Sequence, residues 1–193
     1  DVWLMEYISQ EAISLAGHLN QNKLTLIWDN NGITIDGKVS NADSTDQLRR
    51  FEASGWNTVS IDGHDQAAVE QALIEAKQST RPLLIAAKTT IGFGAPTKQG
   101  TEKVHGSPLG AEELAAAKAA LGIDYPAFEI PAPTLDAWRA AGKRSANAFG
   151  DWQGRFLATD AGARDEFSRR IGGELPVSFG DAITAFKEKL VAD

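Results

Sequence analysis

Short apolar, strand-like runs alternate with segments of helical spacing along the first 90 residues of this chain. The three runs that we predict as strands are 23–28 (KLTLIW), 56–61 and 81–87 (RPLLIAA). Such alternation implies parallel strands joined by crossover helices, because a parallel connection needs a long return path. The runs are apolar almost throughout, so helices are expected to cover both faces of the sheet. The predicted fold class is therefore α/β with a parallel sheet.

The segments between and after these runs carry apolar residues at helical spacing. Residues 6–19 form the first predicted helix, and a capping box of Ser44 with Gln47 begins the second, which ends at Gly55. Asp65 is the predicted cap of the third helix. After a loop at 90–110 that is punctuated by Gly and Pro, helical patterns occupy 111–121, 134–158, 161–171 and 179–191. We predict an α/β part, 1–123, and a helical extension, 124–193, that leads towards another domain.

The composition excludes several classes of protein. The chain has no cysteine, which excludes disulfides, thiolate metal sites and cysteine nucleophiles. A formal net charge of −7 argues against nucleic-acid binding, which needs a basic face. No apolar run reaches the ~18 residues of a membrane span. Asp1 to Glu6 shows neither an initiator Met nor a signal-peptide pattern, so we expect a truncated, cytoplasmic chain, and the acidic balance of its charges favours small ligands.

The candidate site lies where the first predicted strand ends, in Asp29-Asn30-Asn31-Gly32-Ile33. Ligands of parallel sheets bind beyond the carboxyl ends of the strands, which makes this segment and the loop at 89–109 the functional edge. Amide and carbonyl oxygens suit Mg²⁺ or Ca²⁺, although Asn and Gly also form tight turns for backbone reasons alone. Asp1 lies 30 positions before Asn31 and is expected at the tip of the neighbouring strand. One carboxylate, one amide oxygen and one carbonyl would make half of a Mg²⁺ shell.

Histidines and basic pairs receive mostly structural interpretations. His18 is expected on a helix surface and His64 in a turn before a helix. His105 lies in the long loop at the sheet edge, where it could donate to a phosphate or sugar oxygen or move a proton. Arg49-Arg50 and Arg169-Arg170 are interpreted as solvated helix faces with local ion pairs.

Several longer motifs occur in order along nearly the whole chain. They include Trp28-Asp29-Asn30-Asn31-Gly32-Ile33, Asp62-Gly63-His64-Asp65, Lys88-Thr89-Thr90-Ile91-Gly92-Phe93-Gly94 and His105-Gly106-Ser107-Pro108-Leu109-Gly110. Together they closely resemble bacterial transketolase, in the thiamine-diphosphate-binding domain and the linker that follows it. Because several independent motifs share one order, the resemblance is far more specific than any single glycine motif.

The resemblance implies an enzyme that binds thiamine diphosphate through Mg²⁺ and transfers a two-carbon ketol unit between sugar phosphates, in the pentose phosphate pathway. By the family's pattern, the side chains of Asp1 and Asn31 and the Ile33 carbonyl hold the metal. His105 matches a histidine near the diphosphate and the substrate, and Glu6 matches an acidic residue near the cofactor and the subunit interface. Both are therefore catalytic and cofactor-binding candidates. The implied partners are a second copy in a homodimer, or the missing transketolase domains.

Departures from the family pattern leave alternatives open. Val2 and Tyr7 stand where the family has glycine, and Trp3 stands where it has cysteine. These residues favour a non-catalytic binding or interaction module that keeps the fold without the cofactor. A related thiamine enzyme, such as a deoxyxylulose-phosphate synthase or a dehydrogenase first component, is a further alternative. The glutamate that activates the aminopyrimidine belongs, by the resemblance, to another domain of the other subunit, so the isolated chain is expected to be inactive or nearly so.

Overall fold

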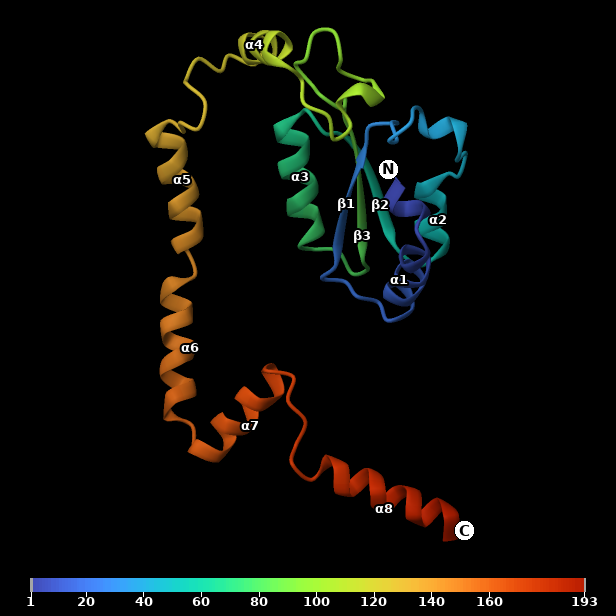
Figure 1. Ribbon diagram of the computed structural model, residues 1–193, viewed down its shortest axis with the longest axis vertical. Helices are drawn as coiled ribbons and strands as arrows, with labels where there is room; N and C mark the ends of the chain where they lie inside the picture. The colour runs from blue at the N-terminus through green and yellow to red at the C-terminus, as the bar shows by residue number, and fades with distance from the viewer. Residues whose placement is uncertain (1, 193) are drawn as a thin grey trace. The chain divides into compact units, whose positions relative to one another are not determined.

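The computed structural model describes the backbone of residues 2–192 and the side chains of residues 4–192 (Figure 1). The chain divides into two units, 1–124 and 125–193. The first unit contains a sheet and the helices that cover it, whereas the second is helical throughout its described residues. Each unit is described separately below.

The first unit is built on a parallel sheet of three strands, β1 (Thr25–Asn30), β2 (Asn57–Asp62) and β3 (Leu83–Lys88). Their order is β1-β3-β2, and both pairings are parallel. The predicted parallel α/β fold is thus confirmed. Each strand begins one or two residues later than predicted. The register begins at Leu83, directly after Pro82, whose carbonyl accepts from Asn57 N at 2.9 Å but whose ring nitrogen cannot donate a hydrogen bond.

Helices cover both faces of the sheet, as the apolar strands predicted. On one face, α1 (Tyr7–His18) and α2 (Gln47–Ala53) enclose a buried cluster with the sheet: Leu4, Ile13, Ala16, Phe51, Trp56 and Leu84. On the other face, α3 (Gln66–Ala76) packs Ala72 and Ala76 against Leu83 and Ile85. The Trp56 indole N–H donates to the Ile13 carbonyl at 2.9 Å, which fixes α1 to the start of β2.

The start of α2 differs from the prediction. Asp46, rather than Ser44, is the N-cap, and its carboxylate accepts a hydrogen bond from the Arg49 N–H at 3.1 Å. Gln47 is the first helical residue, and its buried amide donates to Asp43 at 3.0 Å. The predicted capping box is wrong because an aspartate two residues further on competes for the same backbone donors. The cap predicted for α3 is confirmed, since Asp65 accepts from Ala67 N at 2.9 Å.

Three short 3-10 helices and one α-helix complete the first unit. The 3-10 helices are η1 (Val2–Met5), η2 (Val39–Asn41) and η3 (Glu102–Val104), and the α-helix is α4 (Ala111–Ala120). The predicted loop at 90–110 therefore consists of turns around one 3-10 helix.

The interpretation of Arg49-Arg50 as a solvated pair is wrong for Arg50. Its guanidinium donates to the Leu4 carbonyl at 3.1 Å and to the Gln10 side chain at 2.9 Å.

The second unit consists of α5 (Ala132–Lys143), α6 (Ala146–Ala158), α7 (Ala161–Ile171) and α8 (Phe179–Ala192). The single helix predicted over 134–158 is in fact two, because the hydrogen-bond ladder tightens near Gly142 and Arg144 N bonds to Ala141 O. None of the residues described in this unit is fully buried. Its aromatic side chains stack on one another instead, with 5.3 Å between the ring centroids of Trp152 and Phe156.

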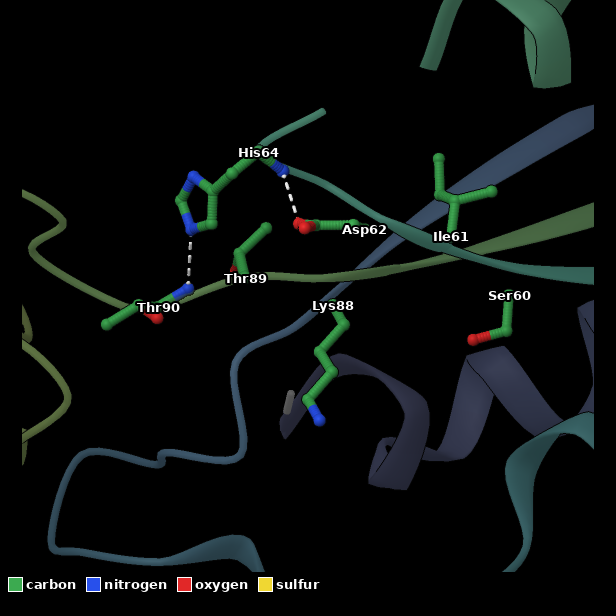
Figure 2. A pocket seen from close by; sticks show the side chains of 7 residues that line it. All are labelled: Ser60, Ile61, Asp62, His64, Lys88, Thr89 and Thr90. Atoms are coloured by element: carbon green, nitrogen blue, oxygen red, sulfur yellow. Dashed lines mark hydrogen bonds between the residues drawn. The ribbon is translucent and has the colours of Figure 1, made fainter. Parts of the chain in front are cut away.

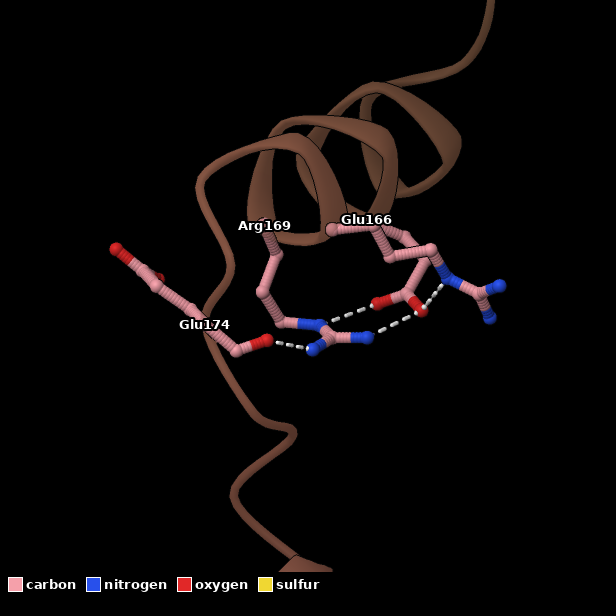
Figure 3. Close-up of polar contacts among 4 residues, drawn as sticks. Glu166, Arg169 and Glu174 are labelled. Carbon is pink, nitrogen blue, oxygen red and sulfur yellow. Dashed lines mark hydrogen bonds and ion pairs between the residues drawn. The ribbon is translucent and has the colours of Figure 1, made fainter. Parts of the chain in front are cut away.

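Local ion pairs hold the end of α7 (Figure 3). Arg169 makes two hydrogen bonds to the Glu166 carboxylate, at 2.8 and 2.7 Å, and Arg170 adds a third at 2.7 Å. These contacts lower the pKa of Glu166 to about 2, chiefly through Arg169. Arg169 also donates to the Glu174 carbonyl beyond the helix. The local interpretation of this basic pair is confirmed. In the described part of the chain, no helix has the length and apolar character needed to cross a membrane.

Candidate cofactor and metal site

The carboxyl ends of the three strands meet at one edge of the sheet. Asn30 of β1, Lys88 of β3 and Asp62 of β2 lie side by side in the register. Each strand is followed at once by a polar or glycine residue, namely Asn31, Gly63 and Thr89. These residues lie at the same edge of the sheet because the three parallel strands begin and end together. The segment at 29–33 and the start of the 89–109 loop thus lie at the expected edge.

Asn31 forms a tight local turn directly after β1. Its side-chain oxygen Oδ1 accepts from the Ile33 N–H at 2.9 Å, and its Nδ2 donates to Asp29 Oδ2 at 3.2 Å. Gly32, between them, has φ +73°, which an L-residue would adopt only with strain. The turn interpretation is therefore confirmed. It does not compete with metal binding, since an amide oxygen has two lone pairs and the turn uses one.

The Ile33 backbone has the properties that a carbonyl ligand needs. Ile33 and Lys38 form an antiparallel bridge whose two hydrogen bonds run from Val39 N to Gly32 O and from Thr34 N to Gly37 O. That pattern leaves the Ile33 carbonyl outside the ladder. The Ile33 side chain is buried and anchors the turn. Asn31 and Ile33 thus fit a hard cation, with an amide oxygen and a carbonyl oxygen carried by one short turn.

The other predicted site residues have different environments. Asp1 lies outside the described residues. Glu6 is exposed at the N-cap of α1, and His105 is exposed at the end of η3. Neither makes a hydrogen bond to Asn31 or Ile33, so of the four candidates that the structure describes, it joins Asn31 and Ile33. Within the same residues, no three His, Asp or Glu side chains come together as a metal cluster.

The loop that carries His105 is tied to α4. The Glu113 carboxylate accepts hydrogen bonds from Thr97 N and Thr97 Oγ1, both at 2.8 Å, and from Lys98 N at 3.1 Å. The Lys98 ammonium donates to the Leu109 carbonyl at 2.7 Å. The Thr97 hydrogen bonds lower the pKa of Glu113. The loop is therefore held in one course on both sides of η3.

A cleft of about 440 Å³ lies beside the ends of β2 and β3 (Figure 2). His64 borders it, and its Nε2 accepts from the Thr90 N–H at 2.9 Å while its ring stacks on Phe93 at 4.1 Å. The His64 N–H donates to Asp62 Oδ1, which confirms the structural turn predicted there. Because Nε2 accepts, the proton of the ring lies on Nδ1. Figure 2 shows Lys88 and Ser60 on the same side of the strands, facing this cleft.

Sequence reasoning missed two contacts that join this edge together. Thr89 Oγ1 donates to Asp29 Oδ1, and Thr90 N donates to His64. The segment that leaves the central strand is thus held from both flanking strands. The only signal in the sequence was the position of these polar residues directly after strands. Their partners are distant along the chain, so no spacing pattern pointed to them.

A parallel sheet whose polar strand ends meet at one edge defines an α/β domain of the class that binds ligands at that edge. Comparison with known proteins identifies which one. The model of the family described as "Transketolase, thiamine diphosphate binding domain" matches residues 1–176. The chain belongs to this transketolase family.

Relatives and solved structures agree with this assignment. Transketolase of Rhodobacter capsulatus is 45% identical over 188 residues, which cover 97% of this chain and 28% of that protein. Transketolase 1 of Aliivibrio fischeri is 48% identical over 183 residues, covering 93% and 27%. The structure of transketolase from Leishmania mexicana matches with a TM-score of 0.83 at 35% identity, covering 92% and 27%. A transketolase mutant of Pichia stipitis in complex with fructose 6-phosphate matches with a TM-score of 0.79 at 35% identity, covering 90% and 27%. The chain thus spans less than a third of the length of these relatives.

Proposed function

We propose that this chain supplies the diphosphate- and metal-binding half-site of a transketolase, an enzyme that transfers a two-carbon ketol unit between sugar phosphates. The observation that carries the proposal is the turn after β1. There the Asn31 amide oxygen and the Ile33 carbonyl are presented together, in a chain of the transketolase family. Matching structures of Pichia stipitis transketolase are complexes with fructose 6-phosphate, xylulose 5-phosphate and sedoheptulose 7-phosphate, which supports sugar phosphates as the substrate class.

In this proposal the chain's residues bind and orient the cofactor. Asn31 and Ile33, together with Asp1, would hold Mg²⁺ or Ca²⁺, whose positive charge would let an acidic chain accept the cofactor's diphosphate. Thiamine diphosphate, when bound, supplies the carbanion chemistry of ketol transfer. His105 donates a hydrogen bond or a proton near the diphosphate and the substrate. Glu6 contributes a carboxylate beside the cofactor and the subunit interface.

We further propose that the chain works with other parts of a transketolase, in a homodimer or with separate domains, in the cytoplasm. Residues 124–193 act as the linker towards those parts. Support comes from the exposed apolar side chains of the helical unit, which include Trp138, Ile171 and Val191. Ketol transfer also needs the pyrimidine-activating glutamate that the family places in another domain. The isolated chain is therefore expected to show no ketol transfer above a heat-killed control.

The second candidate is a binding or interaction module that keeps the fold and has lost the cofactor. The residues that favour it are Val2, Trp3 and Tyr7, which replace smaller family residues near the metal aspartate. Branched and aromatic side chains keep a backbone from approaching phosphate closely. Tyr7 is 88% exposed at the start of α1, so its ring is available for a contact outside this unit.

Titration calorimetry with thiamine diphosphate and Mg²⁺ separates the two candidates. The half-site predicts binding that chelation of Mg²⁺ abolishes and that Asn31→Ala weakens by at least tenfold, because the amide oxygen is lost as a ligand. Asn41→Ala is the matched control, since Asn41 is an exposed residue of the same connecting segment. Absence of binding at millimolar ligand would favour the interaction module and refute the half-site.

A further inference from the structure

Asp29 has a place at the sheet edge that the predicted ligand set does not account for. It lies on β1 two residues before Asn31, and both of its carboxylate oxygens accept hydrogen bonds. Oδ1 accepts from the Thr89 hydroxyl, which follows β3, and Oδ2 accepts from Asn31 Nδ2 at 3.2 Å. The carboxylate therefore bridges the end of the central strand and the Asn31 amide.

These contacts determine which end of the Asn31 amide is available for a cation. The Nδ2 end faces a carboxylate, which can only accept, while the Oδ1 end faces the Ile33 N–H, which can only donate. A rotation of the amide by half a turn would set oxygen against carboxylate and NH₂ against N–H. Both hydrogen bonds would then become repulsions. With the amide as it stands, the nitrogen is engaged by Asp29, and the oxygen has a second lone pair beyond the one that the Ile33 N–H uses.

We propose that Asp29 is a positioning residue that holds the Asn31 amide with its oxygen presented as a metal ligand. The proposal rests on the proposed function, because it concerns the same metal site. Thr89 completes the arrangement, since its hydroxyl holds the carboxylate and its N–H donates to the Asn30 carbonyl at 3.4 Å. Asp29 does not itself need to touch the cation, as both of its oxygens already accept hydrogen bonds within the chain.

The charge of Asp29 suits this role better than a neutral side chain would. A carboxylate offers acceptors on both oxygens, so it can serve Thr89 and Asn31 together. An asparagine at the same position could accept from only one of them and would turn its own NH₂ towards the other. Outer partners of this kind commonly change metal affinity by about 10–100-fold when they are removed.

The test uses the whole chain and three variants. Asp29→Ala removes both acceptors, and Asp29→Asn keeps the shape and one acceptor. Asp36→Ala removes a carboxylate of the same connecting segment that is exposed, and it is the matched control. Calorimetry measures binding of thiamine diphosphate with Mg²⁺. We expect at least tenfold weaker binding for Asp29→Ala, a smaller loss for Asp29→Asn and unchanged binding for Asp36→Ala.

A second readout does not depend on the cofactor. In ¹⁵N-labelled chain the side-chain NH₂ signals of Asn31 are assigned by their loss in Asn31→Ala. We expect the hydrogen-bonded proton to exchange slowly with solvent in the parent chain and in Asp36→Ala, and to exchange faster and shift in Asp29→Ala. A thermal melt of each variant shows whether the unit remains folded. Loss of the fold would also move every amide signal, whereas release of the Asn31 amide would change this pair alone.

The outcomes separate this inference from the proposed function. Parent-like cofactor affinity in Asp29→Ala, or Asn31 NH₂ signals that do not change in that folded variant, would overturn the inference. If the parent chain binds no thiamine diphosphate, the proposed function fails, and the NH₂ signals alone then decide whether Asp29 orients the amide. Weaker binding together with a released amide supports both.

Discussion

Gly17 is the point at which α1 approaches the rest of the first unit most closely. A Cβ at this position would lie 1.7 Å from the Ser54 carbonyl oxygen and 3.4 Å from the Trp56 ring. The Ser54 atom belongs to the backbone after α2, so it cannot swing away as a flexible side chain could. We therefore predict that Gly17→Ala destabilises the first unit, although alanine is the better helix former.

The magnitude follows from three contributions. Ordinary contact begins near 3.4 Å, so α1 and the Ser54 carbonyl must separate by about 1.7 Å, and overpacking of this kind costs about 1–3 kcal/mol. The same movement strains the buried hydrogen bond from the Trp56 indole to Ile13 O, whose loss costs about 1–3 kcal/mol. Helix propensity returns about 1 kcal/mol. The free energy of unfolding is therefore expected to fall by about 1–5 kcal/mol.

Urea unfolding followed by tryptophan fluorescence and circular dichroism measures this change. Ala12→Gly is the control on the same helix, at an exposed position, and it should lower the free energy of unfolding by about 1 kcal/mol through propensity alone. If Gly17→Ala is as stable as the parent chain or more stable, the close approach of α1 to Ser54 is wrong.

Two further predictions concern a helix cap and an ion pair. Asp46→Ala should lower the free energy of unfolding in urea by about 1 kcal/mol, because the N-cap of α2 is lost. Ser44→Ala should leave it almost unchanged. A larger loss for Ser44→Ala than for Asp46→Ala would favour the predicted capping box instead. The pKa of Glu166 is lowered from 4.5 to about 2 by hydrogen bonds from Arg169 and then Arg170, so the folded helix favours the ionised carboxylate. Its stabilising effect is complete above pH 4.5 and disappears as the pH falls towards 2. The pH dependence of the Glu166 carboxyl ¹³C shift measures this pKa. The pKa should rise in 1 M salt, because salt screens an exposed ion pair. A pKa near 4.5 at low salt would contradict the prediction.

Local sequence signals predicted the elements of the first unit well. The apolar runs that became β1, β2 and β3 needed only residue type and spacing, and the Asp65 cap needed only an aspartate before a helical pattern. Motif order was enough to point to the transketolase family, which the match over 1–176 confirms. Such signals work because propensity, capping and periodicity act within a few residues of the chain.

Errors arose where two local signals competed and where the partner of a side chain lies far along the chain. At the start of α2, a serine and an aspartate both offered a cap, and the aspartate is the one that the backbone donors reach. Arg50 has the pattern of a solvated residue, yet its guanidinium donates to the Leu4 carbonyl of a segment far away in the chain. The roles of Asp1, Glu6 and His105 stay predictions.

The sequence by itself determined that this chain forms a parallel α/β unit with a polar edge after β1, because those features depend on residues that are neighbours in the chain. Only the tertiary structure decided that β3 lies between β1 and β2, and that Asp29 meets Thr89 while His64 meets Thr90. Those contacts join residues 60 and 26 positions apart. Partners at such separations are chosen when helices pack on the sheet and bring strand ends together, and no local preference encodes that choice.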